Sequence, residues 1–192
     1  HGDLHTGSIM VTDDDTRMID PEFAVYGPMG FDIGMLLANF LMAFHAQAGH
    51  EAAPGERDAY RDWLLQVVQQ VWEGFTARFR TLWQSERNGI LYPAALFEEQ
   101  GHHMAAEKAC SDYLREVWVD TVGYCGVEMH RRILGLAHIA ELDDIADADR
   151  RAECERRALE LGRLLVLGRQ SVAGPAELAA LARRIEARGV PA

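Results

Sequence analysis

Apolar residues recur at helical spacing from residue 31 almost to the end of the chain, and this periodicity is the strongest constraint on its fold. It predicts helices over residues 32–44, 54–83, 103–120, 125–141, 148–167 and 175–188. Asp32 is the expected N-cap of the first helix, and Pro54 is expected near the start of the second. A chain of 192 residues can bury a sizeable core. We therefore expect one compact, mainly helical unit.

The first thirty residues follow a different pattern. Two short β-type runs, at residues 9–11 and 17–19, flank a polar turn at residues 12–16. Such a pattern predicts a small hairpin with a loop on each side. The expected fold class is mainly α with a short β-hairpin.

Charge and cysteine content exclude several classes of function. The formal net charge of −11 argues against a general binder of nucleic acid or anionic membranes. The three cysteines are widely spaced, which favours reduced thiols and a cytoplasmic protein over a disulfide framework or a zinc site. The most apolar stretch, residues 33–44, is short enough for a buried helix, so no membrane span is expected. The chain begins with His1 and shows no signal-peptide pattern.

The loop before the hairpin displays a carboxylate. Asp3 lies between Gly2 and Leu4, with Gly7 close by, so a ligand could approach its backbone closely. The simpler interpretation is a turn aspartate that bonds its own backbone. His1 and His5 alternate with Asp3 in a pattern that could bind zinc, but no second cluster completes such a site.

Two further carboxylates follow the hairpin. Pro21 biases Asp20 to an extended conformation, in which Asp20 and Glu22 point to the same side. Two oxygen ligands so placed suit Mg²⁺, although a solvated acidic turn remains the alternative. Since the hairpin brings Asp3 near Asp20, one carboxylate could orient a hydroxyl while the pair holds Mg²⁺ on a polyphosphate, as phosphoryl transfer requires.

The residues of this loop carry a resemblance. The stretch H-G-D-L-H-T-G at residues 1–7 resembles the catalytic loop of the aminoglycoside phosphotransferase and choline kinase group, which are relatives of the protein kinases. Within that group, three stretches resemble the methylthioribose kinase family: H-G-D-L-H-T-G-S-I at 1–9, D-P-E-F-A-V-Y-G-P-M-G-F-D-I-G at 20–34 and M-H-R-R-I-L-G-L-A-H at 129–138.

The resemblance implies roles for individual residues. Asp3 would be the catalytic aspartate that orients the attacking sugar hydroxyl, and Asp20 and Glu22 would hold Mg²⁺ on ATP, with Pro21 beside the nucleotide. Arg131 and Arg132 would bind the sugar substrate and the transferred phosphoryl group. Ser8 stands where the wider group has a metal-binding asparagine, so Glu22 would supply the second metal contact.

The arginine pair can also be interpreted without the resemblance. Neighbouring residues on a helix point about 100° apart, so we expect one guanidinium to reach the site and the other to form a surface ion pair. A guanidinium suits phosphoryl charge because it offers paired donors and stays protonated. Surface salt bridges at both positions are the simpler alternative.

The resemblance also implies how the chain is organised. Residues 1–192 would be the C-terminal, helical lobe of a protein-kinase-like α+β fold, with the catalytic loop and metal-binding hairpin at 1–30 and a helical subdomain at 31–192. The single lysine, Lys108, lies in a helical segment, so an N-terminal nucleotide-binding lobe is expected to be absent. The 192 residues alone would then be inactive.

The implied function is that of an ATP-dependent methylthioribose kinase in methionine salvage, a homodimer when full-length. Two alternatives stay open: a kinase of the same fold for another small alcohol, such as an aminoglycoside, choline or homoserine, and a non-catalytic helical binding module.

Overall fold

The computed structural model describes residues 1–187, and the end of the last predicted helix, at residue 188, lies outside this range. Two short antiparallel strands are followed by a stack of helices. The elements are η1 (Thr6–Ser8), β1 (Ile9–Val11), β2 (Thr16–Met18), α1 (Met29–His50), α2 (Asp58–Ser85), η2 (Ala94–Leu96), η3 (Glu98–Gln100), α3 (His103–Leu134), α4 (Ala140–Asp143), α5 (Ala148–Gly168), η4 (Arg169–Ser171) and α6 (Pro175–Ala187). The mainly helical fold with one hairpin is confirmed.

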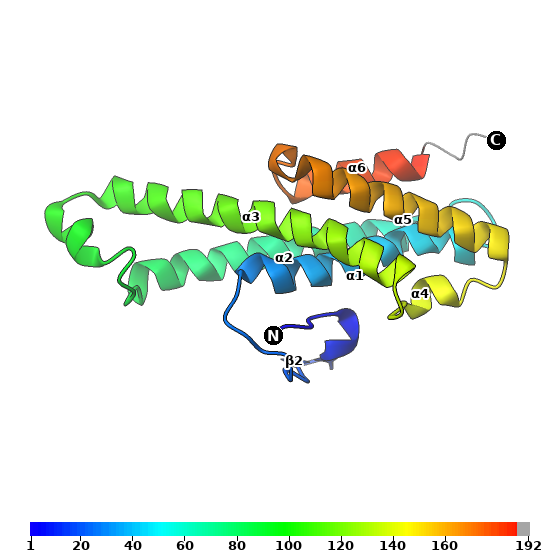
Figure 1. Cartoon of the computed structure of the whole chain (residues 1–192), viewed down its shortest axis with the longest axis horizontal. Coiled ribbons are helices and arrows are strands. Elements are labelled where there is room, and N and C mark those ends of the chain that lie inside the picture. The colour runs from blue at the N-terminus through cyan, green and yellow to red at the C-terminus, as the bar shows by residue number, and fades with distance from the viewer. Residues whose placement is uncertain (188–192) are drawn as a thin grey trace.

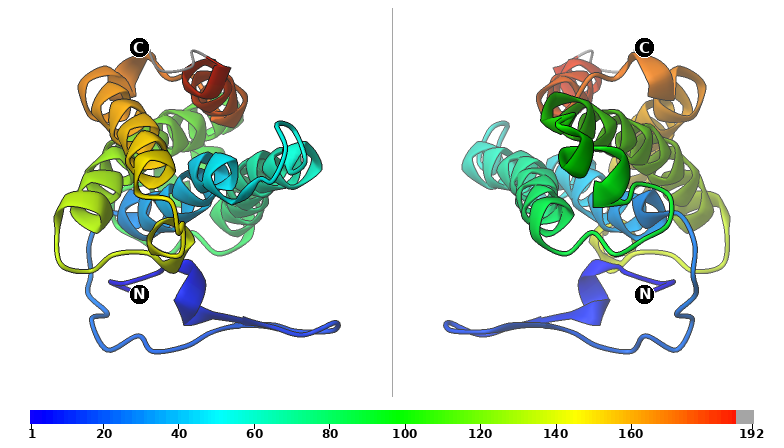
Figure 2. Two further views of the ribbon diagram at one scale, coloured as in Figure 1. Left: turned by 90° about the vertical axis from the view of Figure 1, so that its right-hand side faces the viewer. Right: turned by 90° about the vertical axis from the view of Figure 1, so that its left-hand side faces the viewer.

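The helices form a layered stack with the hairpin on one side. Figure 1 shows α3 running along most of the length of the molecule, with α5 and α6 on one side of it and the N-terminal segment on the other. Both views of Figure 2 place the N-terminal loop and hairpin below the helices, joined to α1 by a long connection. Strand β1 pairs with β2 in the register Ile9↔Met18, so the hairpin is confirmed, with its second strand one residue earlier than the predicted 17–19.

Helix α1 lies at the centre of the stack. It packs mainly on α3 and also contacts α2, α4, α5 and α6. Its side chains Leu37, Leu41 and Met42 are completely buried. By length and composition α1 could cross a membrane, but 78% of its most apolar window is buried inside this fold, as in the core helix of a soluble protein. It is also longer than the predicted 32–44 segment.

Asp32 does not cap α1, contrary to the prediction. The helix begins three residues earlier, after Pro28, and Asp32 lies in its first turn. There the carboxylate accepts hydrogen bonds from the His1 amino group (2.7 Å) and the Gly2 backbone N–H (2.9 Å). Asp32 therefore fastens the N-terminal loop to α1. Pro54 likewise lies in the turn before α2 and not within the helix.

The helices predicted at 103–120 and 125–141 form one continuous helix, α3. The predicted extension beyond residue 134 is wrong, because α3 ends at Leu134. Gly123 does not interrupt the helix, and Gly126 is used for close packing. A Cβ on Gly126 would lie 2.5 Å from the carbonyl oxygen of Gly162 on α5. The contact between two glycines brings the two helix backbones together, and this tertiary packing outweighs the weak helix propensity of glycine.

The crossing of α1 and α3 also depends on glycine. A Cβ on Gly30 would lie 2.7 Å from the Val117 carbonyl oxygen, and one on Gly34 would lie 2.6 Å from the Thr121 carbonyl oxygen. Contacts this short leave no room for a side chain. The two glycines, one turn apart, fix how closely α3 approaches α1.

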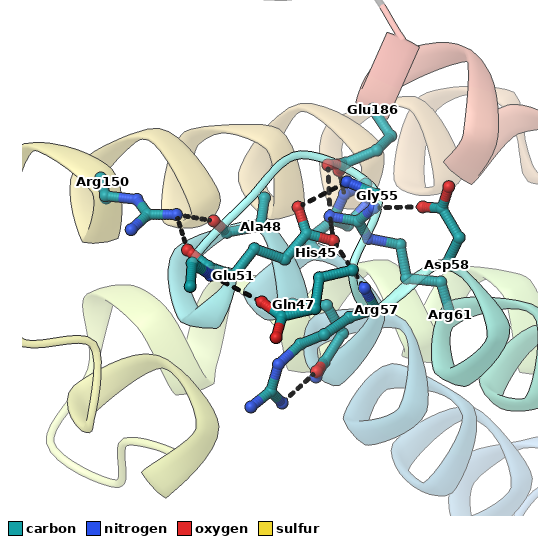
Figure 3. Close-up of polar contacts among 12 residues, drawn as sticks. His45, Gln47, Ala48, Glu51, Gly55, Arg57, Asp58, Arg61, Arg150 and Glu186 are labelled. Atoms are coloured by element: carbon teal, nitrogen blue, oxygen red, sulfur yellow. Dashed lines mark hydrogen bonds and ion pairs between the residues drawn. The ribbon is translucent and has the colours of Figure 1, made fainter.

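A buried polar network, shown in Figure 3, joins the end of α1 to the start of α2, the start of α5 and the end of α6. His45 is completely buried and its Nδ1 lies 3.1 Å from a Glu186 carboxylate oxygen. Arg61 contacts Glu51 at 2.9 Å, and Arg150 donates to the backbone carbonyls of Ala48 and Glu51. The network fastens the loop after α1 and the last helix to the stack.

Burial sets the protonation of this network. Burial lowers the pKa of His45, against the effect of the hydrogen bond to Glu186. Burial alone would raise the pKa of Glu186, but the hydrogen bond to His45 and the nearby Arg157 and Arg61 lower it. The pair is therefore a neutral imidazole beside a carboxylate at neutral pH.

Candidate functional site

The loop that carries Asp3 is held in one conformation by its neighbours. Gly2 has a φ of +86°, and a Cβ there would lie 2.2 Å from the Phe23 carbonyl oxygen, so only glycine fits. The buried Ser8 hydroxyl donates to the Asp3 backbone carbonyl at 3.1 Å. Ser8 thus fastens the loop that carries Asp3.

His1 and His5 also support the loop. The His1 ring Nε2 lies 2.8 Å from the Ile19 carbonyl oxygen, which ties the loop to the end of the hairpin. The Gly7 backbone N–H donates to His5 Nδ1 at 3.0 Å, so a neutral His5 carries its proton on Nε2. That nitrogen lies 3.6 Å from the Asp3 carboxylate. The sequence pattern suggested His5 only as a zinc ligand, and the structure makes it a neighbour of the Asp3 carboxylate.

The structure brings Asp3 and both arginines together across more than 120 residues of sequence. One Asp3 carboxylate oxygen lies 3.7 Å from an Arg132 guanidinium nitrogen and 4.0 Å from one of Arg131. The surface ion pair expected for one of the two arginines is wrong, because both side chains bind a shared acidic partner. That partner is Glu128, a buried residue one turn earlier on α3.

A pocket of about 410 Å³ lies beside this cluster. Its charged lining residues are Asp3, Glu128 and Arg131. The large apolar and aromatic lining residues come from three segments and are Phe23, Phe31, Met35, Tyr124 and Val127. Phe31 on α1 and Tyr124 on α3 meet edge to face at a ring-centroid distance of 5.2 Å. The pocket therefore includes side chains of both helices, α1 and α3, whose separation the glycines fix.

Asp20 and Glu22 are solvent-exposed in the segment after β2. Asp20 has a φ of +65°, so the extended conformation predicted for it is wrong. A left-handed aspartate before proline is unusual, and such backbone strain is concentrated at functional sites. The Ile19 backbone N–H, which donates to the Ser8 carbonyl oxygen at 2.9 Å, fixes the start of this segment beside the Asp3 loop.

The two carboxylates have the chemistry that Mg²⁺ requires. Mg²⁺ is commonly held by one or two protein carboxylates together with substrate phosphates and water. Among residues 1–187, no group of three or more His, Cys, Asp or Glu side chains is placed to hold a metal ion by itself. Because Asp20 is left-handed, strand alternation no longer predicts a shared direction for the Asp20 and Glu22 side chains. Their carboxylate chemistry alone is what suits an ion that arrives with its phosphates.

The cysteines take no part in this site. Cys110, Cys125 and Cys154 are free and buried. Burial raises the pKa of all three thiols, that of Cys154 to about 11. They are therefore protonated and unreactive, which agrees with the prediction of reduced thiols.

Comparison with known proteins identifies relatives of the chain. Residues 1–75 match the phosphotransferase enzyme family. Methylthioribose kinase of Escherichia coli O45:K1 (strain S88 / ExPEC) is 44% identical over 142 residues, which cover 74% of this chain and 33% of that protein. Methylthioribose kinase 1 of Oryza sativa subsp. japonica is 42% identical over 145 residues, with the same two shares.

A third relative has a similar identity and covers a similar share of this chain. Methylthioribose kinase of Yersinia pseudotuberculosis serotype O:1b (strain IP 31758) is 44% identical over 143 residues, 74% of this chain and 32% of that protein. The chain thus spans about a third of the length of these relatives. It is homologous to one part of the methylthioribose kinases.

Proposed function

We propose that this relative of the methylthioribose kinases carries the sugar-binding and catalytic part of an ATP-dependent small-molecule kinase. The reaction is transfer of the γ-phosphoryl group to the anomeric hydroxyl of 5-methylthioribose, which gives 5-methylthioribose 1-phosphate for methionine salvage. The observation that carries this proposal is the convergence of Arg131 and Arg132 on Asp3, next to a pocket that Asp3 and Arg131 line. Relatives that are 42–44% identical and named methylthioribose kinases support the substrate.

Asp3 is the residue that orients the attacking hydroxyl. Its nearest arginine nitrogens, at 3.7 and 4.0 Å, are too distant for hydrogen bonds, so a carboxylate oxygen can accept one from the substrate. A hydroxyl held there would lie next to two guanidinium groups. Their positive charge and paired donors stabilise the charge that develops on the transferred phosphoryl group.

The two kinds of residue that line the pocket match the two ends of the proposed substrate. Sugar hydroxyls need hydrogen-bond partners, which Asp3 and Arg131 offer. A methylthio group needs an apolar surface, and the side chains of Phe31, Met35 and Tyr124 provide one. Cationic alcohols such as choline suit this site poorly, because both arginines would repel them.

ATP and Mg²⁺ complete the proposed reaction. Asp20 and Glu22 would hold Mg²⁺, with Pro21 between them next to the nucleotide. When bound, the ion neutralises phosphate charge. The chain's own residues orient the sugar and place positive charge beside the transferred group.

The organisation of the whole enzyme is part of the proposal. We assign residues 1–30 to the catalytic loop and metal-binding hairpin, and 31–192 to the helical subdomain, with a nucleotide-binding lobe supplied by a longer polypeptide. Met10, Val11 and Met18 on the hairpin are 61–70% exposed, and an apolar face of this kind suits contact with another lobe. The full-length enzyme would be a cytoplasmic homodimer that binds neither nucleic acid nor membranes.

Isothermal titration of the 192-residue chain with 5-methylthioribose tests the sugar site directly. We expect saturable binding that Asp3→Asn weakens about tenfold, since a hydrogen bond to a charged group is lost. Asp14→Asn, in the exposed hairpin turn, is the matched control and should change nothing. Preference for choline over methylthioribose, or equal affinity in Asp3→Asn, would contradict the proposal.

A further inference from the structure

Glu128 is a buried carboxylate beside the candidate site. It lies on α3 one turn before the arginine pair, and only 4% of its surface is exposed. A carboxylate is costly to bury unless charged or hydrogen-bonding partners compensate it. The partners of Glu128 therefore indicate what it does.

Both arginines bind Glu128. Arg131 donates from Nε to one carboxylate oxygen at 2.6 Å and from an Nη to the other at 2.9 Å. Arg132 donates from Nε at 2.7 Å to the oxygen that also accepts the Arg131 Nη. The hydrogen bond to Glu128 raises the pKa of Arg131. One carboxylate thus fixes the orientation of two guanidinium planes.

The same bonds determine how the arginines face Asp3. With Nε of each side chain engaged by Glu128, guanidinium nitrogens of Arg132 and Arg131 lie 3.7 and 4.0 Å from the Asp3 carboxylate. If the arginines were released, direct hydrogen bonds to Asp3 would be the nearest way to compensate their charge. Such hydrogen bonds would occupy the oxygens that the substrate hydroxyl requires.

We propose that Glu128 is a positioning residue, which fixes Arg131 and Arg132 beside Asp3 and keeps them from hydrogen-bonding to the Asp3 carboxylate. The proposal rests on the proposed function for its substrate. The geometric part of it concerns the protein alone and can be measured without substrate. A carboxylate that only stabilised the end of α3 would leave sugar affinity unchanged once the protein is folded.

The first measurement is NMR of the arginine Nε–H groups in the 192-residue chain. Hydrogen bonds from both Nε–H groups to a buried carboxylate protect them from exchange, so Arg131 and Arg132 should give slowly exchanging signals. Glu128→Gln should broaden or remove both, while Glu116→Gln, on the exposed face of the same helix, should preserve them. Retention of both signals in Glu128→Gln would overturn the proposal.

The second measurement is methylthioribose affinity in a double-mutant cycle. We expect Glu128→Gln to weaken binding about tenfold or more, as for other hydrogen bonds to charged groups. Because Glu128 acts through the arginines, the loss in Glu128→Gln/Arg132→Ala should be smaller than the product of the two single losses. A loss equal to that product would contradict a positioning role.

Glu128→Asp keeps the proposal testable if Glu128→Gln does not fold. The shorter side chain keeps the charge but cannot span both guanidinium groups, so at most one protected Nε–H signal should remain. Wild-type signals and affinity in Glu128→Asp would overturn the proposal. If the wild-type chain binds no methylthioribose but shows both protected signals, the proposed substrate is wrong and the positioning geometry stands.

Discussion

Replacement of Gly34 by alanine should destabilise the protein, although alanine is the better helix former. The added Cβ would lie 2.6 Å from the Thr121 carbonyl oxygen and 2.9 Å from both the Cys125 backbone nitrogen and the Tyr124 Cβ. Two of these three atoms belong to backbone that cannot rotate away, so α1 and α3 must separate. Overpacking of this kind costs about 1–3 kcal/mol.

Gly74→Ala supplies the matched control. Gly74 lies inside α2, and a Cβ there would have no neighbour within 4 Å. It gains the same helix propensity, about 1 kcal/mol, without a clash. The helix propensity gained is the same in both variants, so it cancels when their free energies of unfolding are compared. The remaining difference is the cost of separating the helices, which we expect to be about 1–3 kcal/mol.

Urea unfolding followed by circular dichroism at the helical band measures both variants. Gly74→Ala should move the midpoint upward and Gly34→Ala downward, with unchanged slopes. Because Tyr124 and Glu128 lie on the displaced helix, Gly34→Ala should also weaken methylthioribose binding. Equal stability of the two variants, within about 0.5 kcal/mol, would refute the reasoning that backbone contact sets the α1–α3 distance.

Three further predictions concern the core, the buried network and the metal site. Leu41→Ala removes a completely buried side chain of α1 and should cost about 2–5 kcal/mol of unfolding free energy in the same urea assay. The folded-state pKa of His45 lies below its ordinary value of 6.5, so the unfolded chain takes up a proton first as the pH falls. The contribution of His45 to the unfolding free energy is fully present above about pH 6.5, and the unfolding free energy should fall by up to about 1.4 kcal/mol at pH 5.5. His45→Gln should lose this pH dependence. A wild-type melting temperature that is flat between pH 7.5 and 5.5 would contradict the prediction. Mg²⁺ with ATP should shift the NMR signals around Asp20 and Glu22, and Asp20→Asn should weaken that response, whereas unchanged shifts would argue against the metal assignment.

The sequence predicted the elements better than their junctions. The hairpin and most helices are found where their residue patterns placed them, because those patterns are local. The break near Gly123 was wrong because long-range packing of Gly126 against Gly162 holds α3 continuous. The conformation of Asp20 was equally out of reach, since a residue before proline is normally extended and the loop contacts that hold it are not local.

The candidate site was also predicted only in part from the sequence. Asp3, Arg131 and Arg132 were found from motif resemblance, and the structure places them together. Glu128 was missed although a signal was present: it precedes the two arginines by three and four positions, the spacing at which helix side chains meet. Asp32 was assigned as a cap because its partners, His1 and Gly2, lie far from it in sequence.

The central position of α1 has a consequence for how the protein is made. Its main partner, α3, begins about fifty residues after α1 ends. During translation at about 5–20 residues per second, a helix apolar enough for a membrane is therefore exposed for several seconds before α3 can cover it. We expect the nascent chain to depend on chaperones during this interval, and overproduction to favour aggregation unless synthesis is slowed.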